Sequence, residues 1–145
     1  MATRWRRWVA DDHASAAGRF DSSITQHVPR EHWRDGAGGS SIAFLLFHTT
    51  FHQDLAFNTA MTGRAPLLDA HRDVLGLASF APGAGLAEAE DPSLTAALDL
   101  DQLVRYAADV NDAVSTGLDE MDVSAVDGVP PANERVAGIA GIPVD

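Results

Sequence analysis

The sequence contains no cysteine among its 145 residues. A disulfide framework, a thiolate metal site and a cysteine nucleophile are therefore excluded. Any metal ion must bind imidazole or oxygen ligands. The chain also lacks an apolar run of 18 residues, and its basic start, MATRWRRWVADDH, continues into acidic residues instead of the apolar core of a signal peptide. We expect a cytoplasmic protein with no membrane partner.

Lysine is absent as well, and the ten basic residues, all arginine, are outnumbered by 21 acidic residues. The resulting formal net charge of −11 repels polyanions, so we expect no nucleic-acid partner. Hydrophobic residues make up 46% of the chain and charged residues 21%, a mixture that favours a folded core over disorder. The length fits one domain over residues 1–145.

Three long stretches have apolar residues at helical spacing. The first covers Thr3–Val28, the second Ser41–Met61, and the third Asp99–Met121. The third is the most regular, because its apolar residues repeat every three or four positions along one stripe. The second is apolar almost all round at its start, so we expect it to be the most buried helix.

The connecting segments predict little further regular structure. A short helix fits between Pro66 and Gly76, and Leu77–Pro92 reads as a long loop that is placed to cover a site. Beyond the third stretch, prolines and small residues leave room for at most one short helix, Ala132–Ala140. We therefore predict an all-α, antiparallel bundle of three long helices plus a short fourth segment.

Two histidines lie in the central stretch SSIAFLLFHTTFHQDLAFNTA. His48 and His52 are four residues apart, which places them on one face of a helix with Cβ atoms about 5–6 Å apart, close enough to share one metal ion. The zinc metalloprotease signature is excluded, because Thr49 stands where that motif has glutamate.

The surroundings of this pair leave two interpretations open. His48 and His52 share a stripe with Leu45, Leu55 and Thr59, which predicts that they face the bundle interior. Buried histidines are either metal ligands or core residues whose ring nitrogens bond to a backbone carbonyl, a carboxylate such as Asp54, or water. The second interpretation corresponds to a non-catalytic bundle with a structural or interaction role.

The remaining polar residues carry less chemical information. We expect His13 and His27, which lie near the apolar stripe of the first helix, to be hydrogen-bonded core histidines. His32 and His71 are expected to face solvent. The acidic residues, Asp54 included, are expected mainly to form a solvated surface.

The segment SSIAFLLFHTTFHQDLAFNTAMTGRAPLL resembles the second helix of DinB-like proteins, the DinB/YfiT and mycothiol-transferase type. In that helix a small residue and isoleucine precede a leucine and then a histidine, here Ser41, Ile42, Leu45 and His48. The resemblance covers most of the chain from Trp5 to about Met121. It implies a four-helix bundle that holds a divalent metal, zinc or nickel, and acts as a metal-dependent thiol (mycothiol-type) transferase or hydrolase. The implied partner is a low-molecular-weight thiol.

Carried over to this chain, the resemblance makes His48 a metal ligand and puts His52 one turn below it, in the wall of the site. The family's other ligands come from an HxxxH or ExxxH pair on a fourth helix, and no histidine follows His71 here. Since catalytic zinc usually has three protein ligands, we expect an incomplete site in this chain. The ending GIAGIPVD resembles the loop before that fourth helix, which favours truncation over loss.

Assembly is predicted from the side of the second helix that a fourth helix would cover. That side carries the large residues Phe44, Phe47, Phe51 and Leu55. Left exposed, they would form an apolar patch, so we predict a homodimer in which a partner's helix fills the groove. The alternative is that the tail Val129–Asp145 folds back as a partial lid.

Overall fold

The regular structure of the chain is helical in a computed structural model, which describes residues 2–122 and 137–139. The long helices are α1 (Ala2–Phe20), α2 (Ile42–Asp54) and α5 (Leu100–Glu120), and the short ones are α3 (Leu68–His71) and α4 (Pro92–Ala97). Two π-helical segments, η1 (Asp21–Thr25) and η3 (Leu55–Met61), extend α1 and α2, and η2 (Arg30–His32) is a 3₁₀ turn. No strand occurs within the described ranges, so the predicted all-α class is confirmed.

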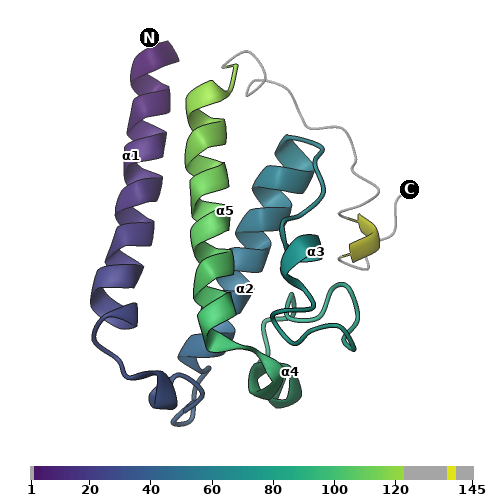
Figure 1. Cartoon of the computed structure of the whole chain (residues 1–145). Coiled ribbons are helices and arrows are strands. Elements are labelled where there is room, and N and C mark those ends of the chain that lie inside the picture. Colours follow the sequence, from purple (N-terminus) through teal and green to yellow (C-terminus); the bar gives the residue numbers. More distant parts are fainter. Residues whose placement is uncertain (1, 123–136, 140–145) are drawn as a thin grey trace.

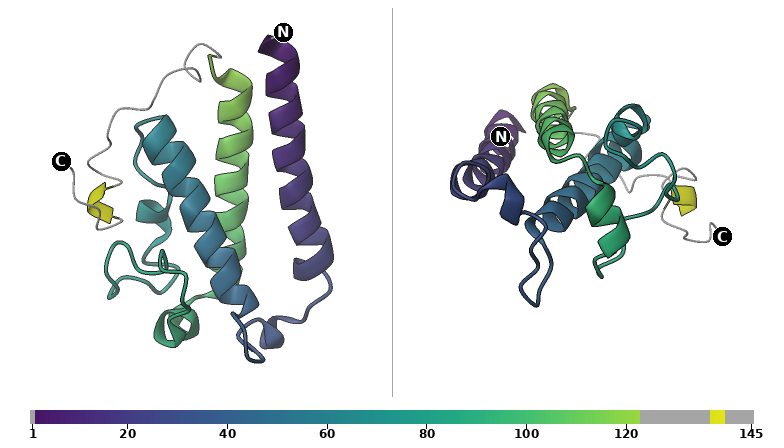
Figure 2. Two further views of the ribbon diagram at one scale, coloured as in Figure 1. Left: turned by 180° about the vertical axis from the view of Figure 1, so that it is seen from behind. Right: turned by 60° about the horizontal axis from the view of Figure 1, so that its bottom comes forward.

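The three long helices lie side by side, with α5 between the other two (Figures 1 and 2). α5 packs against both α1 and α2, whereas α1 and α2 barely touch each other. α1 runs in the opposite direction to α2 and α5, which are parallel to each other (Figure 1). The arrangement is therefore antiparallel only between α1 and its two neighbours.

The helix boundaries follow local signals. Ser41 is the N-cap of α2, where its hydroxyl accepts a hydrogen bond from the Phe44 backbone N–H at 3.1 Å. α2 and η3 together end at Met61, as predicted, and Gly63 follows in the left-handed conformation with φ of 69°. α4 was not predicted, although its signal is present: the Asp91 carboxylate caps a helix that begins with proline.

The chain between α2 and α5 returns across one side of α2. The large side chains predicted to form an exposed patch are buried here, with exposed fractions of 1% for Phe44, 0% for Phe47, 1% for Phe51 and 5% for Leu55. The patch prediction is therefore wrong, because the returning segment contributes leucines to the same core (Leu75, Leu77, Leu94 and Leu98). Ile139 also packs against this core. The rest of the predicted lid, and of the predicted helix Ala132–Ala140, lies outside the described residues.

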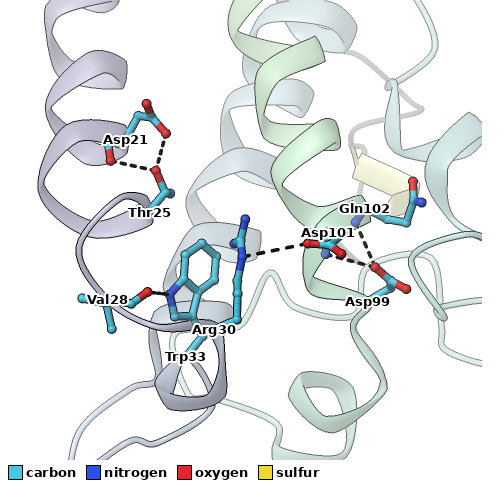
Figure 3. A network of polar contacts seen from close by, with 8 residues as sticks. All are labelled: Asp21, Thr25, Val28, Arg30, Trp33, Asp99, Asp101 and Gln102. Carbon is cyan, nitrogen blue, oxygen red and sulfur yellow. Dashed lines mark hydrogen bonds and ion pairs between the residues drawn. The ribbon is translucent and has the colours of Figure 1, made fainter.

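The connection between η1 and α2 is tied to the start of α5 by polar contacts (Figure 3). Trp33 is fully buried and donates its indole N–H to the Val28 carbonyl at 2.9 Å. The Arg30 guanidinium lies 3.9 Å from the centre of the Trp33 ring, and its Nε lies 3.9 Å from Asp101 Oδ1. Asp99 caps α5 by accepting from the Asp101 and Gln102 backbone N–H groups. These contacts fix one end of the three-helix array.

The helices of the protein are short or carry many polar residues. Within residues 2–122 and 137–139, none of them has the length and apolar character needed to span a bilayer.

Candidate functional site

His48 projects from the middle of α2 towards the loop between α3 and α4. Its side chain is 13% exposed, and its ring stacks on Phe44 with centroids 5.2 Å apart. Nδ1 lies 2.8 Å from the Gly85 carbonyl oxygen, so Nδ1 carries the hydrogen and donates it. Nε2 is then unprotonated in the neutral ring, and a carboxylate oxygen of Glu88 lies 3.9 Å from it. The ring is thus held by its Nδ1 side and presents a lone pair on Nε2.

His52 lies one turn further along α2 and is exposed. Its Nε2 donates to the Leu86 carbonyl at 3.2 Å, and its ring meets the His48 ring edge to face at a centroid distance of 4.4 Å. The structure therefore brings the two predicted residues together. Their predicted place in the bundle interior is wrong for His52, which is exposed, whereas His48 is mostly buried beneath the loop between α3 and α4. On the rest of the predicted stripe, Leu45 is 44% exposed while Leu55 and Thr59 are buried. The buried face of α2 is instead the one that carries Phe47, Phe51 and Asp54.

Gly85 places the carbonyl that holds His48. Its φ is 90°, a conformation that costs glycine little. A Cβ atom at this position would lie only 2.3 Å from Cε1 of Phe47, so only glycine lets the loop backbone come this close to α2. The PGAG sequence around it, which lacks the features of a phosphate loop, therefore serves to bring two backbone carbonyls to the histidines.

Glu90 fixes the other end of the same loop to the start of α2. Its two carboxylate oxygens accept from the Ser41 backbone N–H and the Ser41 hydroxyl, each at 2.7 Å. Burial by itself would raise the pKa of Glu90, but the hydrogen bonds from Ser41 stabilise the charged form and hold the pKa below its ordinary value. Sequence analysis did not identify this contact, since its partners are 49 residues apart.

The fit of the described residues to a metal ion is only partial. Two imidazoles on one tetrahedral ion have ring centroids roughly 5 Å apart, and the observed separation of 4.4 Å is close to that value. In the described part of the chain, however, no group of three or more potential ligands (His, Cys, Asp or Glu) is placed to hold an ion. The described residues therefore supply at most two of the three protein ligands that catalytic zinc usually has.

Asp54 forms a second polar centre on another face of α2, and its predicted place on a solvated surface is wrong. It is completely buried. Its carboxylate accepts from the Leu67 and Leu68 backbone N–H groups at 3.0 and 2.9 Å, from the Asn58 amide at 2.8 Å and from the Tyr106 hydroxyl at 2.8 Å. Burial, followed by the negative charge of Asp54, raises the pKa of Tyr106 far above its ordinary value. Every bond of this centre is made within the chain.

The other histidines divide differently from the prediction. His71 is mostly buried, and its Nε2 lies 3.0 Å from a carboxylate oxygen of Asp109, so its predicted exposure is wrong. His27 is exposed and not a core residue. His13 is half-buried, and burial lowers its pKa. His32 is exposed, as predicted, and contacts Asp35.

Comparison with protein-family models, with curated proteins and with solved structures gave no match to this chain. The resemblance to DinB-like proteins therefore rests on the residues of the second-helix motif.

Proposed function

We propose that His48 is a ligand of a divalent metal ion, zinc or nickel, in a DinB-like metal-dependent thiol transferase or hydrolase. The observation that supports this most is the hydrogen bond from His48 Nδ1 to the Gly85 carbonyl. Histidines that bind metals almost always donate their other ring N–H to a carbonyl, carboxylate or water, which fixes the tautomer and the direction of the free lone pair. Here the free lone pair is on Nε2.

The described residues supply only some of the other metal ligands. His52 is the second candidate ligand, since its Nδ1 is free once Nε2 has donated to Leu86. A third ligand must come from outside the described residues, either from elsewhere in the protein or from a second copy. We assign no general base, and no described carboxylate is within hydrogen-bonding distance of His48 Nε2.

The chemistry that such an ion supplies is Lewis acidity, which lowers the pKa of a bound water or thiol towards neutrality. The chain's own residues have a positioning role: the Gly85 carbonyl orients His48, and the Phe44 ring supports it from one side. This sequence has no cysteine to supply the thiol, and the DinB-like resemblance implies that the thiol is a low-molecular-weight molecule of the mycothiol type.

A second candidate function is a non-catalytic bundle with a structural or interaction role. It is favoured by the fact that both histidines bond to consecutive loop carbonyls, Gly85 and Leu86. In that case the two rings hold the loop against α2, and no metal binds in a fixed ratio to protein.

We also propose that the protein is a cytoplasmic homodimer, on grounds that differ from the predicted aromatic patch. The open face of α2 and its extension η3 carries mostly small or apolar residues next to the metal candidate, namely exposed Leu45, Thr49, His52 and Ala56. A second helix laid on this face would approach His48 and His52 closely enough to supply the missing ligand.

Zinc titration of the full-length protein by calorimetry tests this proposal. The loss of a partner to a metal ligand commonly costs about 10–100-fold in affinity, so removing the ligand in His48→Ala is expected to weaken binding at least that much. His32→Ala is the matched control, because the His32 side chain is exposed and contacts Asp35, which is not part of α2. Binding that is equal in all three proteins, or absent from all three, would favour the non-catalytic bundle.

A further inference from the structure

A cavity of about 400 Å³ lies between α1, α2 and α5, on a different face of α2 from His48. It exists because α1 and α2 barely touch although both pack against α5. Its volume falls within the roughly 300–1,000 Å³ range of small-molecule sites.

The body of the cavity is apolar. Ala16 and Ala17 line it from α1, Leu46 from α2, and Val104 and Ala107 from α5. The alanines leave the space that larger side chains would fill. Such a surface suits an apolar ligand body, since burying apolar area yields roughly 25 cal/mol per Å².

One end of the cavity is polar, with one residue from each helix. Gln53 of α2 donates through Nε2 both to His13 Nε2 of α1 and to Asn111 Oδ1 of α5, the latter at 3.2 Å. His13 Nδ1 lies 3.5 Å from the Ser115 hydroxyl. His13, Gln53 and Asn111 all line the cavity.

The polar end still has one hydrogen-bond donor and one acceptor available for a ligand. Among the described residues, Gln53 Oε1 and Asn111 Nδ2 have no hydrogen-bond partner, which leaves one acceptor and one donor side by side. Turning both amides by 180° exchanges the roles and again leaves one donor and one acceptor. A carboxamide has the complementary pair, an N–H and a carbonyl.

The residues at the polar end also determine which charge a ligand head can carry there. His13 is neutral near pH 7 because burial lowers its pKa. Asp21, the acid that lines the cavity, begins η1, eight residues or about 12 Å beyond His13, and already accepts from Thr25 and Gln26. Among the residues that line the cavity, no charged group therefore compensates a charged ligand head at Gln53 and Asn111.

We propose that this cavity binds a small amphipathic molecule with an uncharged, carboxamide-like head at Gln53 and Asn111 and an apolar body between α1, α2 and α5. The site is independent of any metal at His48, which lies on another face of α2.

Three probes of equal chain length separate the features of this site: octanamide, octanoate and octylammonium. Each is titrated into the full-length, ¹⁵N-labelled protein while the side-chain amide signals of Gln53 and Asn111 are followed by NMR. Octanamide is expected to shift both signals and to bind at least about tenfold more tightly than either charged probe, because a charge buried without a partner is costly.

Two variants and a control complete the test. Ala16→Phe, at an exposed position that lines the cavity, fills the space and is expected to abolish binding of octanamide. Gln53→Leu is expected to weaken octanamide at least about tenfold, while Gln102→Leu, outside the cavity, leaves it unchanged. The proposal is overturned if octanamide leaves both signals unmoved, if the three probes bind equally, or if Ala16→Phe still binds. If, without a probe, the Gln53 and Asn111 signals depend on protein concentration in the wild type but not in Ala16→Phe, a second copy occupies the cavity and the proposal is also overturned.

Discussion

Helix α2 carries two polar centres that differ in almost every respect. Asp54 is fully buried, and four donors from the same chain satisfy its carboxylate. His48 and His52 lie about 120° and about 160° away around the helix. His48 is partly and His52 more fully accessible, and each donates one ring N–H to a loop carbonyl. The Asp54 centre is closed, whereas the histidine centre keeps ring nitrogens available for a ligand.

The difference separates structural polar groups from functional candidates. A buried charge is tolerated only when its bonds are complete, so a closed centre such as that of Asp54 stabilises one arrangement of α2, α3 and α5. A polar centre that is hydrogen-bonded on one side and open on the other can bind a ligand without disturbing the fold. Stability should therefore respond strongly to changes at Asp54 and weakly to changes at His52.

The largest effect is expected for Asp54→Ala. It leaves the Tyr106 hydroxyl, the Asn58 amide and two backbone N–H groups without their buried acceptor, so the free energy of unfolding should fall by about 3–5 kcal/mol. Urea denaturation followed by circular dichroism measures it. Asp112→Ala, at an exposed position on α5, is the control and should change stability by less than about 0.5 kcal/mol. Equal losses in both variants would contradict the closed centre.

Gly85→Ala is expected to have the next largest effect. The added Cβ meets Phe47 in a backbone conformation that alanine avoids, so the loss should be about 2–3 kcal/mol. Gly38→Ala is a matched control, because Gly38 has nearly the same φ, 91°, but nothing lies within 4 Å of its Cβ position. The difference between the two variants in urea denaturation isolates the contact with α2. If the two losses are the same, the loop does not pack on α2 as described.

Glu90→Gln tests the second contact between the loop and α2, the one between Glu90 and Ser41, through the pH dependence of stability. The folded-state pKa of Glu90 lies below its ordinary value of 4.5, so its contribution to stability is present above about pH 4.5 and is lost as the pH falls through the folded-state pKa. Wild type should exceed the variant by about 1 kcal/mol near pH 7 and lose that advantage in acid. Denaturation at a series of pH values measures it, and a difference that stays constant down to about pH 3 would contradict the Ser41 contact.

The smallest effect on stability is expected for His52→Ala. The side chain is exposed and its single bond is to the Leu86 carbonyl, so the loss should be below about 0.5 kcal/mol. Thermal denaturation without added metal measures it. A loss near that of Asp54→Ala would mean that the histidine centre is structural.

Local features of the fold were predictable from the sequence. The spacing of apolar residues predicted all three long helices, and Ser41, where the second stretch was predicted to begin, is the N-cap of α2. These signals act within one or two helical turns, so they can be read from adjacent residues.

Features that depend on distant partners were not predictable. Asp54 was read as a surface residue because its donors Leu68 and Tyr106 are 14 and 52 residues away. The signal that was missed is its place at helical spacing behind Phe47 and Phe51, in the most apolar stretch. The burial of the aromatic residues likewise depends on the segment between α2 and α5. The path of that segment across α2 cannot be predicted from the spacing of apolar residues.

The pairing of His48 with His52 was predictable from their spacing, but their partners were not. Spacing gives a shared helix face, whereas the loop carbonyl that selects the tautomer of His48 is 37 residues away. The spacing also misplaced His52 in the interior, because it cannot tell which side of an almost wholly apolar helix remains open.

The open histidine centre is tested most directly by long-range ¹H–¹⁵N NMR of the histidine rings, with and without zinc. We predict that His48 without metal has its proton on Nδ1, and that zinc moves the His48 Nε2 signal while leaving His32 unchanged. A proton on Nε2 of His48, or a His48 ring that zinc leaves unchanged, would contradict the account.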